Sequence, residues 1–138
     1  MEKPKQMNTT FKIQIDLLNI SFWVVYGFRT SELFIGALNT IDLPKDVKKL
    51  AEEFENEEYH GCVYVDKHKQ VRLLHLINKS RLVHEVTHIT DYISDYYRFR
   101  TEKEFRAYLH DYIVKTIKQR LKDESSASIK TSSIQGLL

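Results

Sequence analysis

Apolar and polar residues alternate along two stretches in the first part of the chain, which predicts β-strands. Residues 11–17 place an apolar side chain at every second position, the period of a strand with one buried face. Residues 20–26 are rich in β-branched and aromatic side chains and end at Gly27, which predicts a second strand. The pattern leaves open whether the two form a hairpin or one bulged strand. Residues 28–43 show no sustained period, so we expect a loop with at most one short strand.

Helical and strand patterns then follow in turn. Residues 44–54 begin with a proline and continue with apolar positions three and four apart, which predicts a helix. Residues 62–66 and 69–77 predict a hairpin. The pattern breaks after residue 77, and Ser80 is a suitable cap for the helix that we expect at residues 81–97.

The last part of the chain predicts one more helix and a polar tail. A helical pattern covers residues 101–122, whereas residues 123–138 are rich in serine and lack a packing pattern, which predicts a flexible tail. With a polar lead-in at residues 1–10, this leaves a single domain at residues 11–122. Its fold class is α+β, with a small, largely antiparallel sheet, a helix that carries the candidate site and a long helix after it.

Composition limits the classes of function. At 138 residues, with 42% hydrophobic and 12% aromatic residues, the chain has the make-up of one globular domain. No apolar run approaches the length of about 18 residues that a membrane helix needs, and the charged N-terminus lacks a signal sequence. We therefore expect a cytoplasmic protein without membrane contact, and the net charge of +2 gives little support for nucleic-acid binding. The single cysteine, Cys62, forms no internal disulfide and no thiolate cage, so a metal site would need histidine and carboxylate.

Candidate chemistry lies in His84-Glu85-Val86-Thr87-His88, an HExxH motif. On a helix, His84 and His88 stand one turn apart on the same face and can direct two ring nitrogens at one metal ion. Glu85 is rotated by about 100° from His84, where its carboxylate can take a proton from a metal-activated water. The apolar positions of this helix lie on a different side from the histidines: Leu82, Val86, Ile89, Ile93 and the pair Tyr96 and Tyr97.

A catalytic zinc ion usually has three protein ligands, so the motif needs a partner. The candidates in this half of the chain are Asp91, Asp95, Glu102, Glu104, His75 and His110. Asp91 and Asp95 continue the histidine stripe along one straight helix and cannot surround the same ion, which favours a ligand from the following helix. His75 faces either a cleft or the core, and His110 lies on an apolar helix face that is typical of a core histidine.

The motif, followed after a short aromatic segment by Glu104-Phe105-Arg106-Ala107-Tyr108, resembles small gluzincin-type zinc metallopeptidases. Compact members of this group are often encoded by bacteriophages and mobile elements. The resemblance implies that His84, His88 and Glu104 bind Zn²⁺, that Glu85 is the general base, and that the small Ala107 lets the two helices pack closely.

Two alternatives to this assignment stay open. Glu102 is a rival third ligand. Thr101 and Glu104 also fit a capping box, in which the glutamate satisfies the start of its own helix and needs no metal. Tyr108 follows Glu104 by one turn on the same face, where its hydroxyl could stabilise an oxyanion or pack in the core.

The expected function is a zinc-dependent peptidase that acts on a protein or peptide in the cytoplasm, which is the host's if the chain is phage-encoded. The alternative is a non-catalytic protein of the same fold, a structural or host-interaction component of a phage and in that case virion-associated. A protein partner that holds the polar tail fits this alternative.

Overall fold

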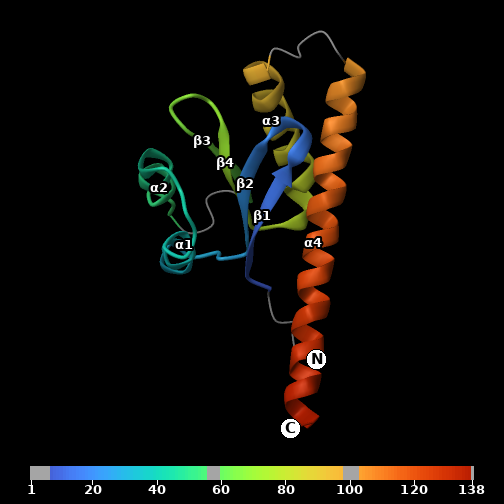
Figure 1. Ribbon diagram of the computed structural model, residues 1–138. Helices are drawn as coiled ribbons and strands as arrows, with labels where there is room; N and C mark the ends of the chain where they lie inside the picture. The colour runs from blue at the N-terminus through green and yellow to red at the C-terminus, as the bar shows by residue number, and fades with distance from the viewer. Residues whose placement is uncertain (1–6, 56–59, 98–102, 138) are drawn as a thin grey trace.

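A computed structural model of the chain describes residues 7–55, 60–97 and 103–137, with side chains described up to residue 125. Four strands form one sheet, and helices lie on both sides of it (Figure 1). The elements in chain order are β1 (Thr9–Ile15), the 3-10 turn η1 (Asp16–Leu18), β2 (Ile20–Tyr26), α1 (Ser31–Leu38), α2 (Lys45–Ala51), β3 (Gly61–Val65), β4 (Val71–Leu76), the 3-10 turn η2 (Lys79–Arg81), α3 (Leu82–Tyr97) and α4 (Lys103–Leu137). The predicted α+β class is therefore confirmed.

The strand order is β1-β2-β4-β3, so the last strand of the sheet by sequence lies in its interior. β1 and β2 form an antiparallel hairpin, which settles the alternative that the sequence left open; they are joined through η1 and through Asn19, whose φ of 51° turns the chain back. β3 and β4 form the second antiparallel pair, as predicted. β2 and β4 run parallel, since α1 and α2 connect the two hairpins.

The two faces of the sheet bury separate cores. On one face, alternate residues of β1 such as Phe11 and Ile13 pack against α3 and α4. On the other, Val25 and Leu73 pack under α1 and α2. Figure 1 shows α3 and α4 together on one side of the strands and the two short helices on the other. α3 lies over β3 and β4, whereas α4 lies over β1.

The prediction of a loop at residues 28–43 was wrong, because residues 31–38 form α1. Thr30 caps this helix by accepting a hydrogen bond from the amide of Leu33 at 3.2 Å. Phe34, Ala37 and Leu38 then fall on one buried face. The signal was present as a cap followed by helical spacing, but the segment is only eight residues long and contains Gly36, which lowers helix propensity.

α4 is also longer than the sequence predicts. It continues through the residues expected to form a polar tail and ends at Leu137, after 35 residues (Figure 1). Residues 123–137 contain no proline, and extending an existing helix avoids the cost of nucleation. α4 is long but too polar to cross a membrane. In the described parts of the chain, no other helix is long and apolar enough to do so.

The entry into α3 differs from the prediction that Ser80 caps it. Ser80 lies within the 3-10 turn η2, which Asn78 caps: its Oδ1 accepts a hydrogen bond from the amide of Ser80 at 3.0 Å. The chain then makes one 3-10 turn before α3 begins at Leu82. Only two residues and η2 separate β4 from α3, so the first turn of α3, which carries the histidine motif, follows closely on an interior strand.

Candidate metal site

α3 presents its histidines to solvent. The predicted apolar stripe is confirmed over its first part, where Leu82, Val86, Ile89 and Ile93 are buried, but not at its end, where Tyr96 is 46% exposed. His84 and His88 are exposed, and half of the His84 side-chain surface is accessible. At 100° per residue the histidines point away from the core. They are therefore accessible to an ion without any opening of the fold.

The two imidazoles converge on one point. Their Nε2 atoms lie 3.2 Å apart and their ring centroids 4.8 Å apart. Two nitrogens bound to one tetrahedral zinc ion at about 2.05 Å each are about 3.3 Å apart. The side chains of His84 and His88 thus already have the separation that a shared metal ion requires.

Glu85 lies beside this pair but is buried. Its side chain is 6% exposed, and its Oε1 is 3.9 Å from Nε2 of His84. The carboxylate packs against Gly61 at the start of β3, where a Cβ atom would come within 2.8 Å of Cγ of Glu85. Gly61 therefore leaves the space that Glu85 occupies, a relationship that the sequence motif alone did not reveal.

Cys62 follows Gly61 and lies near the same carboxylate. Burial raises the pKa of its thiol, and the negative charge of Glu85 raises it further, against a hydrogen bond with Tyr64 that lowers it. The thiol stays protonated at neutral pH, which agrees with a site built from histidine and carboxylate.

The register between α3 and α4 is set by two contacts. Arg106 forms an ion pair with Asp91. One turn further along α4, His110 Nε2 lies 3.2 Å from Thr87 Oγ1 and 3.3 Å from the carbonyl oxygen of Val83. The Thr87 hydroxyl already donates to that carbonyl, so Nε2 of His110 carries a proton and donates. The sequence predicted a core position for His110, but its side chain is 23% exposed and joins the two helices.

This register separates Glu104 from the histidine pair. The helices are antiparallel, so the level of His84 and His88 corresponds to about residue 111 of α4, and Glu104 lies about 10 Å further along the helix axis. Glu104 and Ala107 are both exposed, so Ala107 does not bring the helices closer together. Within residues 7–55, 60–97 and 103–125, no group of three histidine, cysteine, aspartate or glutamate side chains is arranged to hold a metal ion. Thr101 and Glu102 lie outside the described residues.

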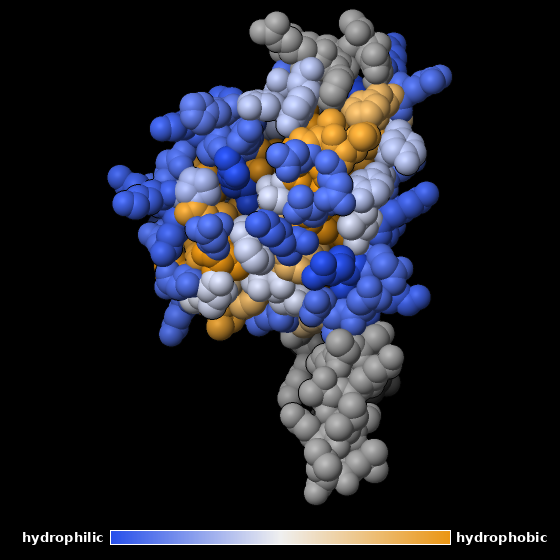
Figure 2. All heavy atoms as spheres, in the orientation of Figure 1, coloured by the Kyte–Doolittle hydropathy of each residue, from blue (hydrophilic) through white to orange (hydrophobic). Residues whose placement is uncertain are grey.

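Tyr108 lies on another side of α4. It is 70% exposed and borders a shallow hollow of about 190 Å³ with Leu17, Phe105 and Leu109, at the turn between β1 and β2. Figure 2 shows hydrophobic surface along this upper part of α4. The histidine pair is on α3, which lies over the opposite strands of the sheet. The structure therefore does not bring the Tyr108 hydroxyl to the site.

His75, which the sequence left between cleft and core, is a core residue. Its ring is fully buried and stacks on Phe34 with centroids 3.8 Å apart, and Nε2 lies 2.9 Å from the carbonyl oxygen of Gly27. Burial lowers the pKa of His75 to about 4, against hydrogen bonds with the backbone of Gly27 and Phe28 that raise it. His75 is neutral at pH 7 and lies on the α1 and α2 side of the sheet, away from the metal pair.

Comparison of the chain with protein-family models, with curated proteins and with solved structures finds no match. The case for a function therefore rests on the geometry of His84, Glu85 and His88 and on the resemblance of the motif.

Proposed function

We propose that this protein is a zinc-dependent peptidase of the compact gluzincin kind, in which His84 and His88 hold the metal ion and Glu85 is the general base. The observation that carries the proposal is the distance of 3.2 Å between the two Nε2 atoms. Without an ion this is the distance of a hydrogen bond between the two ring nitrogens, and the same separation suits tetrahedral coordination of one ion by both.

The chemistry divides between the ion and the chain. When bound, zinc supplies a Lewis acid that activates water and polarises the scissile carbonyl. Glu85, 3.9 Å from Nε2 of His84, accepts the proton of the attacking water and passes it to the leaving amine. Because its side chain is almost fully buried, few water molecules compete for its oxygens, and Gly61 keeps it close to the histidines.

The substrate would bind along the adjacent edge of the sheet. β3 is the outermost strand and contacts α3, so an extended peptide that pairs with its free side would pass the first turns of α3. We propose a protein or peptide substrate on this basis. A cytoplasmic location suits the lone, half-buried thiol of Cys62, which needs no oxidising compartment.

Three variants test the proposal. We expect His84→Ala and His88→Ala each to reduce zinc affinity at least tenfold in calorimetry, whereas His68→Ala, which removes an exposed histidine at the β3–β4 turn near the other end of α3, leaves it unchanged. Glu85→Gln should keep zinc and lose cleavage of a denatured-protein peptide library read by mass spectrometry. Full cleavage by Glu85→Gln would refute its role as general base.

A second candidate function follows from the exposure of the histidines. Since no third ligand lies beside them among the described side chains, the ion's remaining positions are open to a group from another protein. In that case the chain is a non-catalytic interaction protein, such as a phage structural or host-interaction component, and zinc joins it to its partner.

Glu104 separates the two candidates. As the third ligand that the resemblance implies, it must move toward the histidines when zinc binds, so Glu104→Gln should weaken zinc binding at least tenfold and abolish cleavage. In the interaction protein, Glu104→Gln leaves zinc affinity unchanged. Asp123→Asn is the matched control, because it removes one exposed carboxylate from the same helix far from the histidines.

A further inference from the structure

A second site lies at the other end of α3, about 12 Å along the helix from the histidine pair. There a cavity of about 90 Å³ opens between the β1–β2 turn, the start of β4 and the last turns of α3. Figure 1 shows that both hairpin turns reach this end of the sheet. An adjoining hollow continues past the β3–β4 turn. Three residues line both spaces: Lys69, Tyr92 and Tyr96.

Lys69 has a backbone conformation that disfavours most side chains. Its φ is 65°, in the left-handed region, where an L-residue costs about 1 kcal/mol or more and where hairpin turns usually have glycine or asparagine. Among the described residues, its ammonium group forms no ion pair with a carboxylate. The turn would form more easily with glycine than with lysine, and Lys69 lines both spaces.

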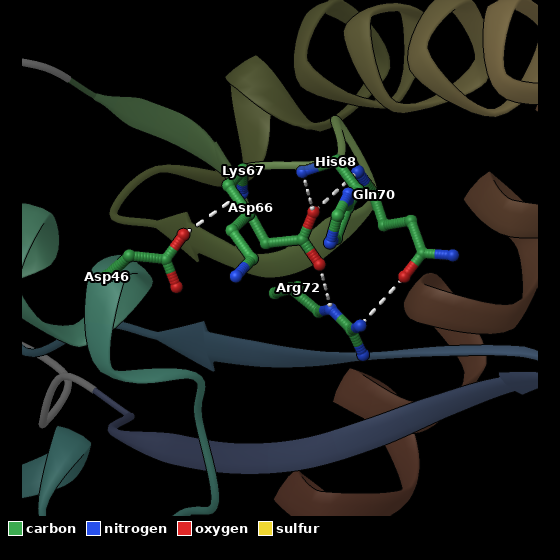
Figure 3. A network of polar contacts seen from close by, with 6 residues as sticks. All are labelled: Asp46, Asp66, Lys67, His68, Gln70 and Arg72. Carbon is green, nitrogen blue, oxygen red and sulfur yellow. Dashed lines mark hydrogen bonds and ion pairs between the residues drawn. The ribbon is translucent and has the colours of Figure 1, made fainter.

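Arg72 lies on the wall of the same cavity and is held in place (Figure 3). Its Nε donates to Asp66 Oδ2 at 2.8 Å and its Nη2 donates to Gln70 Oε1 at 2.7 Å. Asp66 is itself fixed by the amides of His68 and Gln70. A guanidinium has five N–H donors, so these two hydrogen bonds leave other N–H groups of Arg72 for a ligand.

The two charged residues that line the cavity itself, Lys69 and Arg72, are both cations. Burial alone would raise the pKa of Asp66, but the hydrogen bonds from Arg72, Gln70 and His68 outweigh it and hold the pKa below its ordinary value. Asp66 is therefore ionised and balances Arg72, which leaves Lys69 as the excess charge. Asp95 borders only the adjoining hollow, so an anion fits the cavity beside Arg72 and not the hollow.

Tyrosines of α3 line another side of the cavity. Tyr97 donates a hydrogen bond from its hydroxyl to the carbonyl of Leu18 at 3.0 Å, which fixes its ring, and Tyr96 packs edge-on against it at 4.9 Å between centroids. Tyr96 is still 46% exposed. A cavity of about 150 Å³ is known to hold one benzene ring, so a ring seated here must extend into the hollow beside Tyr96.

We propose that this site binds a small aromatic anion, with a planar ring against Tyr92 and Tyr96 and a carboxylate or phosphate held by Lys69 and Arg72. Aromatic walls stack on planar rings, and a held guanidinium beside an ammonium suits an oxyanion. Both aromatic acids and mononucleotides carry this chemistry. The site is independent of the proposed peptidase activity.

Calorimetry on the full chain tests the site with phenyl phosphate, 4-hydroxybenzoate, uridine monophosphate, phenol and inorganic phosphate. We expect at least one aromatic anion to bind tenfold or more tightly than both phenol and phosphate. Tighter binding of the nucleotide assigns the site to nucleotides, and tighter binding of phenyl phosphate or 4-hydroxybenzoate assigns it to aromatic acids. The proposal is overturned if inorganic phosphate binds as tightly as the aromatic anions, or if no probe binds.

Variants then assign the residues. Lys69→Gly should lose at least tenfold in affinity while the fold keeps or gains thermal stability, so that a loss of binding cannot come from unfolding. Lys67→Gly, which removes the neighbouring charge, should bind as the unmodified chain does. Tyr96→Ala should lose affinity as well. If Lys69→Gly binds the aromatic anion with unchanged affinity, the proposed site is wrong. His84→Ala, which changes the histidine pair, should bind it as the unmodified chain does.

Discussion

Gly61 and Glu85 come so close that any side chain on the first would displace the second: a Cβ on Gly61 would lie 2.8 Å from Cγ of Glu85 and 3.3 Å from Cδ1 of Leu76. Gly61→Ala should therefore lower the free energy of unfolding by about 1–3 kcal/mol, as other overpacked sites do. Urea denaturation measures the change.

The double variant shows whether the cost arises from Glu85. The Glu85→Ala variant lacks the atoms with which a Cβ at position 61 would clash. In that background, Gly61→Ala should therefore lower the free energy of unfolding much less. If Gly61→Ala costs the same in both backgrounds, Leu76 or the backbone is responsible and the glycine has no special relationship to the carboxylate.

His75 should make the fold sensitive to acid. Its pKa is about 4 in the folded chain and about 6.5 when the ring is free in water, so the unfolded chain takes up the proton first as the pH falls. The stability that the neutral His75 ring gives the fold is fully present above about pH 6.5 and is lost between pH 6.5 and 4. A shift of 2.5 pH units corresponds to about 3 kcal/mol.

A comparison with His75→Phe isolates this contribution, because protonation of carboxylates affects both proteins alike. The variant keeps a ring against Phe34 but loses the hydrogen bond to Gly27, so it should be less stable at pH 7 and lose less stability on acidification. Stability curves that stay parallel from pH 7 to 4 would contradict a neutral, buried His75.

Zinc should stabilise the chain through the histidine pair. A ligand at one hundred times its dissociation constant adds about 2.7 kcal/mol when it binds the folded state alone. We expect added zinc to raise the melting temperature, a chelator to reverse the rise, and His84→Ala or His88→Ala to abolish it. A rise that persists in both variants would place the ion elsewhere.

Where one regular period covers a whole element, the sequence predicted the structure well. The alternating residues of β1 and the buried stripe of α3 follow the expected patterns, because each of these elements buries one continuous face, and the β3–β4 hairpin forms where its strand patterns predicted it. α1 was missed since eight residues give too few repeats of the helical period. The end of α4 was misjudged because serine-rich sequence argues against packing but does not stop a helix that is already formed.

The candidate site shows a different limit. Spacing alone predicts that His84 and His88 share a helix face, and the imidazoles do converge. Spacing within one helix says nothing about its register with the next helix. Tertiary contacts set that register, between Asp91 and Arg106 and between Thr87 and His110. The positions of Glu104 and Tyr108 relative to the histidines were therefore beyond prediction, as was the close approach of Gly61.

Lys69 provides the last prediction, since its backbone and its side chain have opposite effects. Replacing it with glycine removes the left-handed strain of about 1–2 kcal/mol and adds about 0.5–1 kcal/mol of chain entropy to the unfolded state, so Lys69→Gly should stabilise the fold by about 0.5–1 kcal/mol. Lys67 has no positive φ, so Lys67→Gly gains no such relief and should destabilise the same turn. Chemical denaturation of the two variants side by side measures the difference. Destabilisation of equal size in both would mean that the lysine conformation at position 69 is not strained, and the structural reason to assign its side chain to a ligand would be lost.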